Sequence, residues 1–388
     1  MDINLQKTLL FLLFIGIGIL LKVKLKNKSE LAGIKVIILN LALPATIFIA
    51  LIGVNIEASL LLLPIIALLL NVVLFFVTPL VFPLLGIKKG NPNYRTGQLL
   101  LSSLAPGLSC FPFILEYLGD SYLAKAAMAD LGNKVFVLLV LYLVAMRWHY
   151  KTQEIENTSN RAKFKSLCIA MVSEPVNLFI IAALILLSFG FHMNNLPFIV
   201  SESLSRLSLL MTPLVLLFIG LSVKIKKRQF AQIISMLLLR AGIVVILGIA
   251  LITAVQINVA QDRLLLLAFG LSACSFWPFA HIAAVDAQEK RVLNFKKTFN
   301  QNFAINILAI SFPLSVVIIL GILSAGTLFA SVKTMVLLAG ILIVSGLIYP
   351  AFMLVVKKKT IAQIQSLDTE TGDSYKLKRV SEKLKSLF

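Results

Sequence analysis

Long apolar runs, separated by short polar segments, make up most of the chain between residues 8 and 356. A helix needs roughly 20 apolar residues to cross the hydrocarbon core of a bilayer. The runs do not alternate apolar and polar residues as the strands of a membrane barrel do. The pattern therefore predicts an all-α polytopic membrane protein with eleven spans, over residues 8–22, 32–54, 60–86, 97–118, 122–147, 173–192, 204–223, 229–256, 263–287, 298–324 and 334–356.

Composition supports this class. The chain has 388 residues, of which 59% are hydrophobic and 14% are charged, whereas a soluble protein is roughly half apolar and a quarter charged. The same composition also excludes a disordered chain, a collagen-like chain and a small fold held together by disulfides. Cys110, Cys168 and Cys274 form no framework and show no metal spacing, so we expect no metal and no cofactor.

The position of the positive charge predicts the orientation of the chain. Of the 36 Lys and Arg residues, 29 lie in alternate loops and in the C-terminal tail. Cytoplasmic loops carry such an excess, so the N-terminus is expected outside and the C-terminus in the cytoplasm of a plasma membrane, here the bacterial inner membrane. The net charge of +19 thus reflects topology, and we expect no nucleic acid partner. The basic segments are residues 22–35, 88–95, 147–165, 224–228, 290–297 and 357–388.

Two halves of the chain resemble each other at an offset of about 166 to 169 residues. Pro44 precedes Gly53 in LNLALPATIFIALIG, and Pro213 precedes Gly220 in LSLLMTPLVLLFIG. Each unit contains five spans, and because five is odd, consecutive copies insert with opposite orientation. Inverted repeats of this kind are a transporter architecture with a site near the midplane. The predicted units are a first repeat (1–150), a second inverted repeat (166–325), an eleventh helix (334–356) and a basic cytoplasmic tail (357–388).

Equivalent spans, 97–118 and 263–287, are interrupted. The first contains Pro106, Gly107 and Pro112, and the second contains Pro278 near several serines. Proline lacks a backbone donor, and irregular backbone in a bilayer is tolerated inside protein or beside a water-filled cavity. Kinked but continuous helices are the alternative. The predicted substrate-binding residues are Pro106, Ser109, Cys110, Pro112, Ser272, Ser275, Trp277, Pro278 and Asn302.

Charged and amide side chains inside the spans are further candidates. Asp130 and Lys134 lie four residues apart on one helix face, Asn133 lies between them, and Arg240 is central in its own span. Burying such a charge costs at least about 2.5 to 3.5 kcal/mol, which favours a function in ion coupling. The alternatives are a structural ion pair for Asp130 and Lys134, and a structural tie to backbone carbonyls for Arg240.

At these residues the chain resembles the auxin efflux carrier family, the prokaryotic relatives of plant PIN transporters. The resemblance rests on LNLALPATIFIAL, FPF–LEYLGD–AAMADLGN, EPVNLFIIAALILLSFGF and MTPLVLLFIGLSVK, and covers roughly residues 5–325. It implies two inverted five-helix repeats whose helices 4 and 9 cross at proline breaks, and secondary transport of small organic anions. The family usually has Asn and Gly where this chain has Ala105 and Cys110, so the substrate contacts of that Asn are not carried over.

The leading functional hypothesis is a secondary transporter that moves a small organic anion, such as a carboxylate, by alternating access. The alternatives are a sodium-coupled symporter of the bile-acid type, and a membrane receptor or regulatory subunit without transport. An enzyme is not expected, since His149, His192 and His281 are scattered and form no H-E-x-x-H motif. ATP-driven pumping by this chain alone is not expected either, because it has no phosphate-binding loop. The expected partners are the anion, a coupling ion that is H⁺ or Na⁺, the lipid bilayer and a second copy in a homodimer.

The tail carries Leu377, Val380, Leu384 and Phe388 at helical spacing among basic residues. This pattern is typical of a helix on the anionic inner leaflet, and a freely solvated tail is the alternative.

Overall fold

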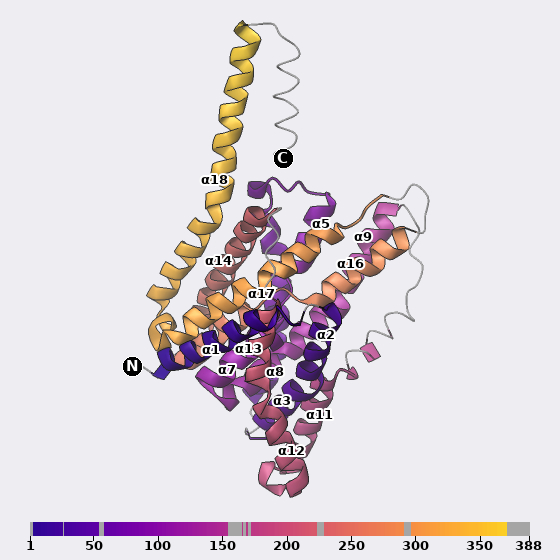
Figure 1. The fold of residues 1–388 in the computed structure, drawn as a ribbon, viewed down its shortest axis with the longest axis vertical. Helices are drawn as coiled ribbons and strands as arrows, with labels where there is room; N and C mark the ends of the chain where they lie inside the picture. Colours follow the sequence, from indigo (N-terminus) through magenta and orange to yellow (C-terminus); the bar gives the residue numbers. More distant parts are fainter. Residues whose placement is uncertain are drawn as a thin grey trace.

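The protein is helical throughout the part of the chain that the computed structural model describes, with no strand there (Figure 1). The described residues are 3–25, 27–53, 58–153, 165, 168–169, 172–222, 229–290 and 296–370. In Figure 1, α12 lies at the lower end, and the last turns of α18 project beyond the other helices at the upper end.

The first half contains nine helices within the described residues. They are α1 (Ile3–Leu21), α2 (Lys28–Ile37), α3 (Leu43–Ile52), α4 (Ala58–Val77), α5 (Pro92–Leu101), α6 (Pro106–Ser109), α7 (Phe111–Leu118), α8 (Asp120–Val135) and α9 (Leu141–Gln153). The π turns η1 (Ile38–Ala42) and η4 (Phe136–Val140) join α2 to α3 and α8 to α9 without interrupting the rods. After α4, Pro79 and Pro83 lack backbone donors, and the chain continues there in 3-10 turns.

The second half has the same helical character. Its elements are α11 (Pro175–Ser188), η5 (Met193–Asn195), α12 (Phe198–Leu209), α13 (Met211–Ser222), α14 (Phe230–Val255), α15 (Ala260–Gly270), α16 (Phe276–Glu289), α17 (Gln301–Ser324), η6 (Gly326–Ala330) and α18 (Val332–Glu370). The apolar part of α18 ends at Val355, but the helix continues to Glu370, and residues 356–370 contain no proline or glycine to end it. The predicted amphipathic pattern at Leu377–Phe388 lies outside the described residues.

Seven helical stretches among the described residues are long and apolar enough to cross a membrane. They coincide with seven of the predicted spans: Ser29–Ile52, Leu60–Val81, Asp120–Gln153, Phe198–Leu221, Phe230–Val255, Gln301–Ser324 and Val332–Val355. Two more predicted spans are shorter apolar helices, Gln6–Leu21 and Pro175–Ser188. The remaining two, 97–118 and 263–287, are each divided into separate helices. The count of eleven crossings therefore stays a prediction.

Small residues let several helices pack closely, as they do in membrane proteins. A Cβ placed on Gly132 of α8 would lie 1.8 Å from the carbonyl oxygen of Pro64 on α4. Likewise, a Cβ on Gly18 of α1 would lie 2.3 Å from the carbonyl oxygen of Leu217 on α13. Glycine is needed at both positions because any side chain would push the paired helices apart.

Three of the basic segments lie together at one end of the fold. Arg95 Nη1 donates to Thr152 Oγ1 over 2.7 Å, and Gln153 Nε2 donates to the carbonyl oxygen of Lys296. The segment 224–228 and most of 154–171 lie outside the described residues. Which end of the fold faces the cytoplasm stays a prediction from the charge pattern.

Candidate functional site

The two interrupted helices contain short stretches of irregular backbone. Between α5 and α6, residues 102–105 are not helical, and we call them the first break. Between α15 and α16, residues 271–275 are not helical, and we call them the second break. The two breaks contact each other, because the Ala105 N–H donates to the carbonyl oxygen of Ala273 over 2.8 Å. They also lie where the two clusters of the hydrophobic core meet.

Most of the irregular backbone lies before the prolines, in residues 102–105 and 271–275, and one further non-helical residue, Cys110, separates α6 from α7. Pro112 lies in the first turn of α7 and Pro278 in the first turn of α16, both after the irregular backbone. The first turn of a helix has no intrahelical acceptor for its N–H groups, so proline fits there without breaking anything. Pro106 likewise occupies the first position of α6. These prolines begin new helices. Because a proline has no N–H to donate and its ring clashes with the carbonyl group four residues earlier, they also keep the preceding helix from continuing through the irregular backbone.

Arg240 of α14 binds the backbone of both breaks. Its guanidinium donates to the carbonyl oxygens of Leu101 (2.8 Å), Ser272 (3.0 Å) and Ser103 (3.1 Å). The side chain is buried, and it satisfies acceptors that a continuous helix would have paired internally. Of the two interpretations from sequence, the structural tie to carbonyls describes this geometry.

Serine hydroxyls pair further backbone groups across the breaks. Ser109 Oγ donates to the Ala105 carbonyl oxygen (2.7 Å) and accepts from the Ala273 N–H (3.0 Å). Ser103 Oγ accepts from the Ser275 N–H at 2.9 Å. Each hydroxyl lies in one half of the chain and binds backbone of the other half, so the two breaks stabilise each other.

The side-chain amide of Asn133 on α8 forms hydrogen bonds with both backbone groups of Leu104 in the first break. Its Nδ2 donates to the Leu104 carbonyl oxygen (3.0 Å) and to Asp130 Oδ1 (2.8 Å). Its Oδ1 accepts from the Leu104 N–H (3.3 Å) and from Asn71 Nδ2 (2.8 Å). The amide therefore connects the irregular backbone to a charged residue on its own helix.

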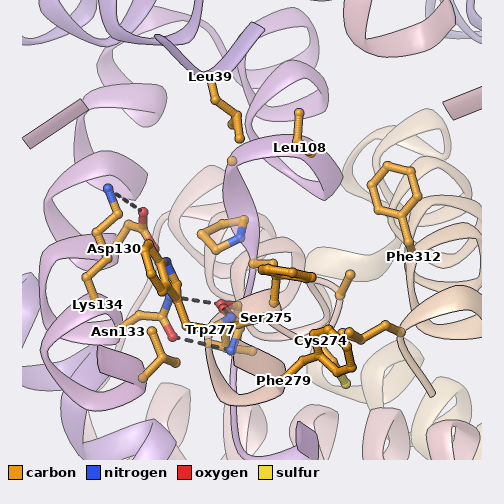
Figure 2. A pocket seen from close by; sticks show the side chains of 18 of the residues that line it. Leu39, Leu108, Asp130, Asn133, Lys134, Cys274, Ser275, Trp277, Phe279 and Phe312 are labelled. Carbon is orange, nitrogen blue, oxygen red and sulfur yellow. Dashed lines mark hydrogen bonds and ion pairs between the residues drawn. The ribbon is translucent and has the colours of Figure 1, made fainter. Parts of the chain in front are cut away.

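A cavity of about 510 Å³ opens beside the two breaks. Figure 2 shows Asp130, Asn133 and Lys134 together on one side of it and Phe312 on the other. Six of the residues predicted from sequence line it, and these are Pro106, Asp130, Asn133, Lys134, Ser275 and Trp277. Much of the remaining wall is apolar or aromatic, contributed by residues such as Leu39, Leu43, Phe218, Phe276, Phe279 and Phe312.

The other predicted site residues do not line this cavity. Asn302 is exposed on α17. The rest are buried next to the breaks or begin the helices that follow them, and these are Ser109, Cys110, Pro112, Arg240, Ser272 and Pro278.

The cavity wall holds four charged side chains, two of which sequence reasoning missed. Lys134 Nζ lies 3.5 Å from Asp130 Oδ2 and 3.3 Å from Glu174 Oε2, and it donates to Asn177 Oδ1 over 2.8 Å. We call Asp130, Lys134, Glu174 and Asn177 the charge cluster. Glu174 caps the N-terminus of α11, in the EPVN motif, and nothing in its local sequence indicates a partner on α8.

Lys35 is the fourth charged side chain of the cavity wall. The charge pattern assigns it to a loop, but the structure places it in α2, inside the apolar stretch Ser29–Ile52. Its Nζ lies 4.9 Å from the ring centroid of Phe276. Among the described residues, no carboxylate oxygen lies within the 4 Å of an ion pair with Lys35.

Comparison with known proteins adds one likeness. No protein-family model matches the chain. Over 238 residues the chain is 28% identical to a protein of Methanocaldococcus jannaschii that is described as an uncharacterized transporter. The match covers 59% of this chain and 71% of that protein. With the apolar helices, this likeness indicates an integral membrane protein.

Proposed function

We propose that the protein is a secondary transporter that moves a small organic anion across the membrane, with the substrate in the cavity beside the two breaks. The observation that carries the proposal is that one cavity is lined by both breaks and by a lysine with no acidic partner among the described residues. Its volume of about 510 Å³ is in the range of small-molecule sites. The likeness to a protein described as a transporter supports the same class of function.

The position of the positive charge in the cavity favours an anionic substrate near Lys35. The four charged side chains of the wall sum to zero. Lys134 lies between two carboxylates, whereas Lys35 has no carboxylate within ion-pair distance among the described residues and lies over the face of an aromatic ring. A lysine ammonium beside an apolar wall gains more from an anionic ligand than from a neutral one, because the interaction is weakly screened there. The wall is mostly apolar and aromatic, which favours an anion with an apolar body.

The N-terminus of α16 favours an anion as well. Ser275, Phe276 and Trp277, where this fourteen-residue helix begins, all line the cavity. The N-terminal end of a helix carries a partial positive charge from its aligned peptide dipoles. Lys35 packs on Phe276 of the same turn, so both positive contributions act on one region of the wall.

The packing of helices supports the proposed inverted repeats. α1 packs on α13, and α11 packs on α3. In the proposed repeats, α11 is the equivalent of α1, and α13 belongs to the equivalent of α3. In both contacts, therefore, the first span of one repeat packs on the second span of the other. Such reciprocal packing fits two units that rock about a central site in alternating access, with α18 outside both.

Uptake into proteoliposomes tests the proposal. The purified protein is reconstituted, and accumulation of labelled mono- and dicarboxylates is compared with that of amines and neutral solutes of similar size. We expect saturable uptake of a carboxylate that unlabelled carboxylates inhibit and amines do not. Saturable uptake of amines alone would contradict the proposal. Tight carboxylate binding without any uptake would favour the receptor alternative.

A further inference from the structure

The hydrogen-bond and ion-pair partners of the Lys134 ammonium, among the described residues, are all oxygen atoms. These are one amide oxygen, Asn177 Oδ1 at 2.8 Å, and two carboxylate oxygens, Glu174 Oε2 at 3.3 Å and Asp130 Oδ2 at 3.5 Å. The side chains of Lys134 and Asp130 are each only 8% exposed. The oxygens come from two elements, α8 and the start of α11, that only the fold brings together.

Carboxylate and amide oxygens are the ligands that hard cations prefer in proteins. The charge cluster contains two carboxylates and one ammonium, so its negative charge is larger than the charge that one ammonium neutralises. An alkali ion carries the same charge as the ammonium and binds to the same kind of atom. The lysine therefore stands where a free monovalent cation would otherwise be held.

We propose that Lys134 is a tethered cation that fills an alkali-ion site, so that removing its side chain creates a sodium-binding site. Without the amine, Asp130 and Glu174 face each other in a membrane-embedded wall with no positive partner. Leaving carboxylates unpaired there is strongly unfavourable, which drives them to take up a cation. Lys134, Asp130 and Glu174 all line the cavity, and this gives an ion from solution a route to the oxygens.

The test uses the purified full-length protein and sodium itself as the probe. Thermal unfolding is measured in sodium chloride and in choline chloride at equal ionic strength and at the same pH, near 8. For Lys134→Ala, we expect sodium to raise Tm by about 2 to 4 °C over choline, and calorimetric titration to show saturable sodium binding. For the wild type, we expect no difference in Tm between the two salts.

The matched control is Lys35→Ala, which removes a lysine from the same cavity wall where no described carboxylate is paired with it. We expect this variant to show no sodium effect. If Lys134→Ala does not fold, Lys134→Ser replaces it, since serine also leaves the position of the ammonium empty. A folded Lys134 variant that ignores sodium, or a wild type that sodium stabilises equally, would overturn the proposal.

The corollary is that wild-type transport requires no sodium, and this corollary rests on the proposed function. The binding measurement does not depend on it, because it needs no substrate and no uptake. Failure of carboxylate uptake with sodium binding in Lys134→Ala would therefore count against the transport function alone. Carboxylate uptake without sodium binding in the variant would count against the tethered cation alone.

Discussion

The backbone N–H of Ala105 donates a hydrogen bond to the carbonyl oxygen of Ala273, and this 2.8 Å contact joins the two breaks directly. Each break is paired only in part by its own helix, for example through the Ser103 N–H to the Leu100 carbonyl oxygen and the Ser272 N–H to the Phe269 carbonyl oxygen. The first relies on Asn133 and on the second break, while the second relies on Ser103, Ser109 and the first break. Backbone that is irregular inside a membrane therefore persists because each half of the chain supplies partners for the other.

Replacing Arg240 with Met is expected to destabilise the protein strongly. The change leaves three buried carbonyl oxygens without their donor, and each such loss costs about 1 to 3 kcal/mol. Arg240→Lys is not expected to restore stability, because one ammonium cannot reproduce the planar fork that reaches three carbonyls. Thermal unfolding in detergent measures the effect, with Arg206→Met, an exposed arginine on α12, as the control. Equal Tm values for Arg240→Met and Arg206→Met would contradict this account.

Replacing Asn133 with Asp is expected to weaken the first break. An aspartate cannot donate to the Leu104 carbonyl oxygen, and it places a second carboxylate beside Asp130. The matched control is Asn302→Asp, because it makes the same change at an exposed position on α17. We expect a lower Tm and weaker carboxylate binding for the Asn133 variant only. Equal Tm values and equal carboxylate affinities for the two variants would contradict the role of Asn133 in pairing the first break.

Charge removal from the charge cluster is expected to follow a definite order of stability. In choline chloride, Lys134→Met leaves two unpaired carboxylates and should be the least stable. Adding Asp130→Asn leaves only Glu174 and should recover part of the loss, and adding Glu174→Gln as well should recover most of it. Breaking one partner of a buried pair costs about 3 to 5 kcal/mol, whereas neutralising all members does not. Full recovery in the double variant would mean that Glu174 does not belong to the cluster.

Replacing Gly132 with Ala is expected to separate α8 from α4. The added methyl group would meet the carbonyl oxygen of Pro64 at 1.8 Å, and overpacking of this kind costs about 1 to 3 kcal/mol. Because Gly132 is next to Asn133, carboxylate affinity should fall together with Tm. Gly321→Ala on α17, where nothing lies within 4 Å of the new methyl, should leave both unchanged or slightly raise Tm. A normal Tm for Gly132→Ala would show that α4 and α8 can move apart freely.

Sequence reasoning identified the helical class and the two interrupted spans because both depend on local signals. Apolar run length predicts a span, and Pro106 and Pro278 mark where the second pieces of the broken helices begin. The first break lies just before the predicted stretch that begins at Pro106, and the second lies among the serines before Pro278. A proline shows where a new helix can start, and the irregular backbone before it depends on Arg240 and on serines from the other half of the chain.

The composition of the site was only partly predictable for the same physical reason. Asp130 and Lys134 were found because four-residue spacing places them on one helix face. Glu174 was missed because its contact with Lys134 joins two distant helices, and Lys35 because a lysine near a basic loop is ordinarily solvated. Asn302 was chosen because its span is the predicted repeat equivalent of the span that holds Asn133, but its own position on α17 is exposed. Whether a side chain faces the interior or the surface depends on how its helix packs, and the repeat pattern does not specify this.

The most direct test of the central claim, that the cavity beside the breaks holds an organic anion on Lys35, is a comparison of carboxylate affinity between Lys35→Met and Lys333→Met. Both changes remove one positive charge, but Lys333 is exposed on α18 and does not line the cavity. Equilibrium binding is measured with the carboxylate that gives the highest uptake in proteoliposomes. The account predicts at least a tenfold loss of affinity, about 1.4 kcal/mol, for Lys35→Met and wild-type affinity for Lys333→Met. Equal affinities in the two variants would contradict it.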